Sequence, residues 1–132
     1  MIGVVRSSEP ILQIAILGSR GQRWFVDAVL DTGATCELTL PSDAIRELGL
    51  RWKDRSIATL AGDSKIESQV YEAEILWDGD VRLIDVHEMD GNPLIGTKLL
   101  EGYRIEIDLI EGGAVEVTPL NQNHNLEEQH DA

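Results

Sequence analysis

The sequence predicts an all-β protein whose strands close into a barrel, with one or two short helices. Many short apolar segments follow one another at close spacing, with glycine, aspartate and proline between them. Several of these segments alternate apolar and polar residues, which is the period of a half-buried strand. Helical patterns occur only near Pro41 and near Thr97. Many short strands with so little helix are typical of a closed all-β barrel.

The first two strands are predicted at residues 11–17 and 23–30, which are apolar and rich in β-forming residues. Residues 18–22 supply turn formers, so the two strands are expected to pair antiparallel. The second strand runs directly into Asp31. Burying a carboxylate at the end of an apolar strand costs free energy, so either Asp31 faces water or the fold requires it there.

One short helix is predicted from Pro41 to Leu48. Proline suits the first helical turn, and Ala44 and Ile45 fall on the same helical face as Leu48. Gly49 follows directly and provides a stop at the C-terminal end. Beyond the helix the pattern returns to the period of a strand.

Two hairpins are predicted in the middle of the chain. The first contains residues 56–61 and the polar segment after them, with Gly62 near its tip, where a positive φ is allowed. In the second, residues 71–77 alternate apolar and polar side chains and Asp78-Gly79 turns the chain into residues 81–86. An Asp-Gly pair between two such runs is a strong signal for a tight turn.

A last hairpin is predicted where residues 103–109 alternate and Gly112-Gly113 turns the chain into residues 115–117. This hairpin is expected to be half-buried. At 132 residues the chain has the length of about one domain, which we place at residues 1–118. The polar tail, residues 119–132, is expected to lack a fixed structure.

Composition argues against several classes of function. The chain has 11 basic and 24 acidic residues and a net charge of −13, so we expect no nucleic-acid partner. This charge favours solubility above all, and attraction of basic substrates is the weaker interpretation. The longest apolar stretch, residues 11–17, is far shorter than the roughly 20 residues that span a bilayer. With one cysteine and no signal-peptide pattern, the chain is expected to be cytoplasmic, without a membrane partner.

Three minor candidates for chemistry lack the spacing that their chemistry needs. His87, Glu88 and Asp90 have no second cluster with ligand spacing, so we expect no metal site and no cofactor. The acidic residues Asp78, Asp80 and Asp85 do not follow the spacing of a calcium-binding loop. No histidine-containing motif accompanies Cys36, whose small side chain suits a semi-buried apolar position.

The most informative motif is Asp31-Thr32-Gly33-Ala34. By itself it predicts only a turn, because Asp and Gly are common turn formers. Two features favour a catalytic role. An apolar strand precedes the motif, and a second apolar segment, residues 93–96, lies far downstream and leads into a short helical turn at residues 97–100.

These features resemble the retropepsin-like aspartic proteases over residues 11–118. Residues 29–34 resemble the catalytic loop of that family. Residues 94–96, followed by a pair of leucines, are similar to its hydrophobic-hydrophobic-glycine segment. Residues 60–63 lie between the two, where the flap belongs. The order and spacing of the three elements are more specific than any one of them, and the likeness is closest to the small single-domain bacterial members.

The resemblance implies a homodimeric aspartic endopeptidase that hydrolyses peptide or protein substrates. One Asp-Thr-Gly motif provides half of an active site, so Asp31 from two chains would meet at a twofold axis and share one proton. The ionised carboxylate would activate a water molecule while the protonated one polarises the peptide carbonyl. Thr32 would join the two loops by hydrogen bonds, and Gly33 would present its amide to Asp31.

The resemblance also assigns substrate binding to the residue after the motif, to the flap and to the downstream segment, namely Ala34, Leu60, Ala61, Gly62, Asp63, Leu94, Ile95 and Gly96. Gly62 would let the flap close over an extended peptide. The alternative is a non-catalytic dimeric β-barrel that uses the same cleft for peptide binding or assembly, because a fold does not determine function. Thr97-Lys98 departs from the family pattern, which leaves substrate selection and dimer contacts open.

Overall fold

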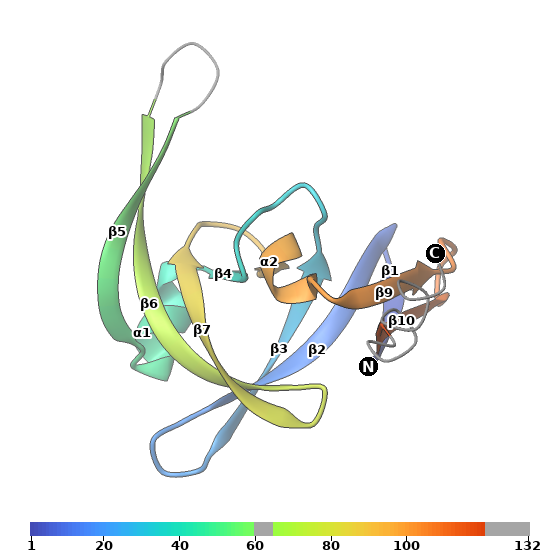
Figure 1. Cartoon of the computed structure of the whole chain (residues 1–132), viewed down its shortest axis with the longest axis horizontal. Coiled ribbons are helices and arrows are strands. Elements are labelled where there is room, and N and C mark those ends of the chain that lie inside the picture. The colour runs from blue at the N-terminus through green and yellow to red at the C-terminus, as the bar shows by residue number, and fades with distance from the viewer. Residues whose placement is uncertain (60–64, 121–132) are drawn as a thin grey trace, which may run out of the picture.

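The computed structural model describes residues 1–59 and 65–120 of the 132-residue chain. The predicted flap residues 60–63 and the tail residues 121–132 lie outside the described residues. The described residues form ten strands and two short helices, which confirms the all-β prediction (Figure 1). In chain order the elements are β1 Ile2–Arg6, β2 Glu9–Leu17, β3 Arg23–Leu30, β4 Leu38–Leu40, α1 Ser42–Leu48, β5 Arg51–Thr59, β6 Lys65–Trp77, β7 Asp80–Glu88, β8 Leu94–Ile95, α2 Thr97–Leu100, β9 Tyr103–Ile107 and β10 Ala114–Pro119.

The ten strands belong to one sheet with the order β5-β6-β7-β4-β8-β3-β2-β1-β10-β9. Strand β2 also pairs with β6, so the strands from β6 through β2 form a ring of pairings. Strand β5 extends from this ring at one end of the molecule, and β1, β10 and β9 extend from it at the other (Figure 1). The expected closed barrel is therefore seen only as this ring, because four strands lie outside it.

The first predicted hairpin is confirmed. Strands β2 and β3 pair antiparallel from Ile11 opposite Val29 to Leu17 opposite Arg23. Alternate side chains of β2 face the core: Leu12, Ile14 and Ile16. Strand β1 is a feature that the sequence pattern did not indicate. It is short, and pairing with β2 on one side and β10 on the other holds it in place.

The helix predicted from Pro41 is also confirmed. Pro41 is extended and precedes α1, and Gly49 ends the helix in the left-handed conformation with φ 64°. Glycine takes this conformation at little cost because it has no Cβ. Within the helix, Ile45 is buried in the core and Leu48 packs against its edge.

The two hairpins predicted in the middle of the chain share one long strand, β6. Its first part pairs with β5 and its last part with β7. The turn into β7 is confirmed at Asp78 and Gly79, whose φ angles of 52° and 88° are both positive. Asp-Gly suits two positive φ angles, and a two-residue turn of this kind matches the twist of the flanking strands.

The prediction of a half-buried last hairpin is only partly right. Val115 and Val117 of β10 are fully buried. On the other side of the hairpin β9 ends at Ile107, which is 39% exposed, and Leu109 beyond it is 66% exposed. The reason is topological, since β9 is the last strand of the sheet and Leu109 lies past its pairing with β10.

The core is one cluster to which the ring strands contribute together with β1 and β10, and its largest fully buried side chains are Leu12, Ile16, Leu38, Leu40, Ile75, Ile84, Ile95, Leu99, Val5, Val86, Val115 and Val117. Helix α2 contributes to this core through Leu99 and Leu100. Over the described part of the chain, no helix has the length and apolar character needed to cross a membrane.

Candidate active site

The Asp31 turn and the downstream apolar segment lie side by side in the structure. Strand β3 pairs in parallel with β8, with Leu30 opposite Ile95. The backbone N–H of Asp31 donates to the carbonyl oxygen of Ile95 at 2.9 Å. The N–H of Ala34 then donates to the carbonyl oxygen of Asp31 at 3.1 Å, which closes the turn. Backbone hydrogen bonds within the Asp31 turn, and to a segment about sixty residues further along the chain, thus hold this loop.

The carboxylate of Asp31 is held by its own loop. The backbone N–H of Gly33 donates to Asp31 Oδ1 at 2.9 Å, and the side chain of Asp31 is partly exposed. A Cβ on Gly33 would lie 3.2 Å from Oδ1, which is a tight contact. Thr32, between them, is exposed. The carboxylate is therefore oriented by one hydrogen bond and keeps its other oxygen, Oδ2, available to a ligand.

Gly96 is required by the close approach of the two segments. A Cβ at this position would overlap the carbonyl oxygen of Cys36 and lie 2.9 Å from that of Ala34. The N–H of Gly96 donates to the carbonyl oxygen of Glu37 at 3.0 Å. Thr97 then donates to the carbonyl oxygen of Ala34 twice, through its N–H at 2.8 Å and its Oγ1 at 3.1 Å. Gly96 and Thr97 thus pin the loop that follows Asp31 against the start of α2.

Asp31 lies at the wall of a cleft of about 940 Å³. Gly33 and Ala34 line the cleft beside it, and Leu94 lines it from β8. Eight of the other lining residues belong to three parts of the chain. The β5–β6 hairpin contributes Ser56, Ile66, Glu67 and Ser68, the end of β7 contributes His87 and Glu88, and the segment after β7 contributes Met89 and Asp90. Of the predicted substrate-binding residues with described structure, Ile95 is buried behind the cleft. Gly96 does not line the cleft, and it contacts the loop after Asp31 through the hydrogen bond to Glu37.

The sequence patterns did not point to several residues that the fold brings to this cleft. Thr39 accepts a hydrogen bond from the N–H of Leu94 at 3.0 Å, and Glu37 also lines the cleft. Lys98, noted in the sequence only as a departure from the family pattern, lines it as well. His87 appears in the sequence only as a rejected metal ligand. Burial lowers the pKa of its imidazole, and its buried Nδ1 has no hydrogen-bond partner among the described residues. Thr39 and His87 lack a local signal because the pairing of β4 with β7 brings them together.

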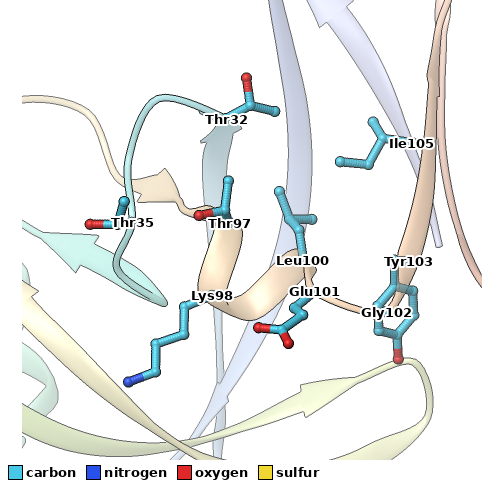
Figure 2. Close-up of a pocket in the computed structure, with 9 residues that line it drawn as sticks. All are labelled: Thr32, Thr35, Thr97, Lys98, Leu100, Glu101, Gly102, Tyr103 and Ile105. Atoms are coloured by element: carbon cyan, nitrogen blue, oxygen red, sulfur yellow. The ribbon is translucent and has the colours of Figure 1, made fainter.

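A second pocket, of about 610 Å³, also borders the Asp31 loop and shares Thr35 and Lys98 with the cleft. Thr32 lines it from the loop, Leu100 from α2, and Tyr103 and Ile105 from β9 (Figure 2). In the figure the side chain of Ile105 extends from β9 toward the part of the pocket that Leu100 and Thr32 line. Among the described residues, no group of three or more His, Cys, Asp or Glu side chains is arranged to hold a metal ion.

Comparison with solved structures identifies the fold. The structure is similar to a retropepsin-like aspartic protease from Rickettsia conorii, with a TM-score of 0.56 and 15% sequence identity over 92% of each chain. It is also similar to the EIAV protease solved with an inhibitor, with a TM-score of 0.53 and 17% identity over 72% of this chain and 88% of that one. The chain has the retropepsin-like fold. No protein-family model and no curated protein matches it in sequence.

Within this retropepsin-like fold, Glu37 ties the Asp31 loop to β7. Glu37 is buried, with only 9% of its surface exposed to solvent. Its Oε1 accepts a hydrogen bond from the backbone N–H of Asp85 at 2.9 Å, and its Oε2 accepts one from the guanidinium of Arg82 at 3.3 Å. The carboxylate thereby accepts hydrogen bonds from two donors on β7, while the carbonyl oxygen of Glu37 accepts one from the N–H of Gly96.

Replacing Glu37 by alanine is expected to lower the free energy of unfolding by about 2 kcal/mol, because the N–H of Asp85 loses its acceptor. Glu37→Gln keeps an acceptor oxygen, so we expect less than half of that loss. Asp43 is the matched control, since it forms an exposed ion pair with Arg46 and Asp43→Ala should change stability by about 0.5 kcal/mol or less. Urea unfolding of the three variants measures the difference. Equal losses for Glu37→Ala and Asp43→Ala would contradict this role of Glu37.

The thiol of Cys36 lies beside the cleft and is half-buried. Burial raises the pKa of this thiol, and the nearby carboxylates of Asp31 and Glu37 raise it further. A raised pKa lowers the fraction of reactive thiolate at neutral pH. This environment agrees with the expectation that Cys36 is a small packing residue.

Because Cys36 is the only cysteine, its reaction with a thiol reagent can be followed directly. We expect the reaction at neutral pH to be about tenfold or more slower in the folded protein than in urea-unfolded chain. The pH midpoint of the rate should also lie higher in the folded protein, since only there is the thiol pKa raised. A midpoint below that of the unfolded chain would contradict this assignment and would revive Cys36 as a candidate nucleophile.

Proposed function

We propose that the protein is a homodimeric aspartic endopeptidase in which Asp31 of two copies forms the catalytic pair. The observation that carries the proposal is the position of Asp31. It follows a core strand, its Oδ1 is fixed by the N–H of Gly33, and its carboxylate lies at the wall of a cleft large enough for a peptide. Both named structures of this fold are proteases.

One chain provides one carboxylate at this position, and acid–base hydrolysis of a peptide needs two groups in opposite protonation states. Two carboxylates close together share one proton, because both ionise together only at a high cost in free energy. A second copy supplies the missing group. Thr32 and Gly33 of each copy then border the pair, Thr32 joining the loops and Gly33 orienting the carboxylate.

The proposed reaction balances within this pair. The ionised Asp31 takes a proton from water as the water oxygen attacks the peptide carbonyl carbon, and the protonated Asp31 gives its proton to the carbonyl oxygen. The resulting gem-diol collapses as the carbon–nitrogen bond breaks. The nitrogen then receives the proton from the first carboxyl group, while a gem-diol hydroxyl returns a proton to the second carboxylate. Both groups end in their starting states.

Substrate binding is proposed for the cleft walls. Ala34 and Leu94 lie beside Asp31, with Ile95 and Gly96 supporting the loop from behind. Residues 60–63, which lie outside the described residues, are proposed as the flap that covers an extended peptide and excludes water from the carboxylate pair.

Digestion of a peptide library from acidic to neutral pH tests the proposal. We expect cleavage that a pepstatin-type inhibitor blocks, with a specific activity that rises with protein concentration as dimers form. Because each chain carries a charge of −13, higher ionic strength should favour the dimer. Peptide binding without cleavage at every pH would favour the non-catalytic alternative instead, a dimeric peptide-binding or assembly module.

A further inference from the structure

The outer face of the sheet carries an apolar patch at the end of the molecule away from α2. There β2 lies between β3 and β6, and the β2–β3 and β6–β7 hairpins cross (Figure 1). Ile16 of β2 and its partner Ile75 of β6 are fully buried, so both face the core. Because side chains alternate along a strand, Ala15 and Leu17, on either side of Ile16, face outward.

Two rows of outward-facing residues form this patch, since residues directly opposite each other in an antiparallel pair share one face of the sheet. The first row crosses β3, β2, β6 and β7 and is entirely apolar, with Phe25, Ala15, Leu76 and Val81. The second row crosses the same strands through Arg23, Leu17, Glu74 and Leu83. We call these eight residues the outer patch.

The apolar side chains of the outer patch are exposed where they lie at its margins. Phe25 on β3 is 64% exposed, and Val81 and Leu83 on β7 are 57% and 61% exposed. Leu17 and Leu76, between them, are partly exposed. Single exposed apolar side chains need no explanation, whereas a contiguous group of them marks an interaction surface.

The outer patch also contains two opposite charges, those of Arg23 and Glu74. Neither forms an ion pair within the described part of the chain. Both lie directly opposite Leu17, one on each side of β2. Their backbones are therefore two strand spacings apart, about 10 Å, with the side chain of Leu17 between them. The patch thus presents one positive and one negative charge, at positions fixed by the sheet, to a partner surface.

A second copy of the outer patch complements the first. If two patches stack face to face with a twofold axis along β2, each residue lies over the residue on the other side of β2 in the second copy. Arg23 of each copy then lies over Glu74 of the other, and Phe25 lies over Leu76. Leu17 lies over its own counterpart. Charges and apolar groups are matched in one arrangement, so the patch has the self-complementarity that an isologous interface requires.

The position of the axis matters for this match. An axis between β2 and β6 would place the charge of Glu74 over Leu17 and the charge of Arg23 over Leu83. Both charges would then be covered by apolar side chains without an opposite charge, which costs free energy. The two charges therefore select the axis along β2.

We propose that the outer patch is a self-association surface on which a second copy of the chain stacks, with the twofold axis along β2. This surface is separate from the proposed pairing of Asp31, because six residues separate Phe25 from Asp31, about 20 Å along an extended strand. A chain can therefore use both twofold contacts together. The product is a tetramer where the contacts close on themselves and a longer assembly where they do not.

Charge exchange at two positions tests the axis. Arg23→Glu and Glu74→Arg should each weaken this association about tenfold, since each change places like charges at two symmetric contacts. The double variant should restore association, and an equimolar mixture of the two single variants should associate as well. The single changes shift the net charge in opposite directions, so a general charge effect cannot weaken both. Sedimentation at fixed ionic strength measures the assembly formed at each concentration.

Phe25→Ser tests the apolar part of the patch, with Ile57→Ser as the matched control. Ile57 is 62% exposed, close to the value for Phe25, and it lies on β5 outside the patch. We expect weaker association only for Phe25→Ser, about tenfold or more, with both variants folded by circular dichroism. Phe25→Ser and the charge variants should still cleave peptides, because none of these changes touches the Asp31 cleft.

The assembly size separates this inference from the proposed function. We expect the unmodified protein to form species larger than a dimer, and Phe25→Ser and the single charge variants to stop at a dimer that cleaves peptides. A dimer that these variants convert into monomers, without cleavage by any of them, supports the inference and contradicts the proposed function. A protein that cleaves peptides and whose assembly is indifferent to these changes overturns the inference alone. A chain that stays monomeric at every concentration and salt overturns both.

Discussion

Replacing Asp31 by asparagine is expected to lower kcat/KM for peptide cleavage by about 10²- to 10⁴-fold, the contribution of a positioned acid–base group. An asparagine side chain neither takes a proton from water nor donates one to a leaving nitrogen. It does keep an oxygen that accepts the N–H of Gly33, the bond that orients the native carboxylate. The variant should therefore fold and dimerise like the unmodified protein.

Asp27→Asn provides the matched control. Asp27 lies on the same strand, β3, but its carboxylate is exposed and forms an ion pair with Arg6. This change removes the same charge without touching the cleft, so cleavage should remain. Steady-state kinetics on one peptide, together with sedimentation of both variants, measures the effect. Full activity in Asp31→Asn would rule out the proposed mechanism.

Gly96→Ala is expected to lower the free energy of unfolding by about 3 kcal/mol, at the upper end of the usual cost of overpacking. The added methyl group would overlap the carbonyl oxygen of Cys36 and press on that of Ala34. Both are backbone atoms that already accept hydrogen bonds from Lys98 and Thr97, so neither can move without breaking the loop. Because Asp31 bonds to Ile95, one residue away, peptide cleavage should fall as well.

Gly18→Ala is the control for that experiment. The nearest atoms to a Cβ on Gly18 belong to the flexible side chain of Gln22, which can turn away. The cost should be about 0.5 kcal/mol or less, as for most surface substitutions. Urea unfolding of both variants gives the comparison. A Gly96→Ala protein as stable as Gly18→Ala would mean that the Asp31 loop and α2 do not approach as closely as described.

Local sequence patterns predict the fold well where the deciding forces are themselves local. The turn at Asp78 and Gly79 needs two positive φ angles, and the residue types there are the ones that accept them. The helix from Ser42 ends at Gly49 for the same reason. In both cases the conformational preference of one or two residues decides the structure, so the sequence alone carries the information.

Long-range pairing decides the features that local patterns miss. Strand β4 has three residues, and it forms because β7 and β8 pair with its two edges. Strand β1 depends on β2 and β10 in the same way. Glu37 shows no signal in the sequence, since its partners Arg82 and Asp85 are more than forty residues away. Such positions are recognised only after the sheet order is known.

The sequence by itself determined the strand that delivers Asp31, the turn chemistry of Thr32 and Gly33, and the need for a second apolar segment ending in Gly96. Tertiary structure alone decided that this segment pairs in parallel with β3, that the cleft opens beside Asp31, and that β9 is the last strand of the sheet among the described residues. The physical reason is the distance along the chain over which the deciding interactions act. Backbone preferences and hydrophobic alternation act over a few neighbouring residues, whereas the cleft and the strand order arise from hydrogen bonds between strands far apart in the chain.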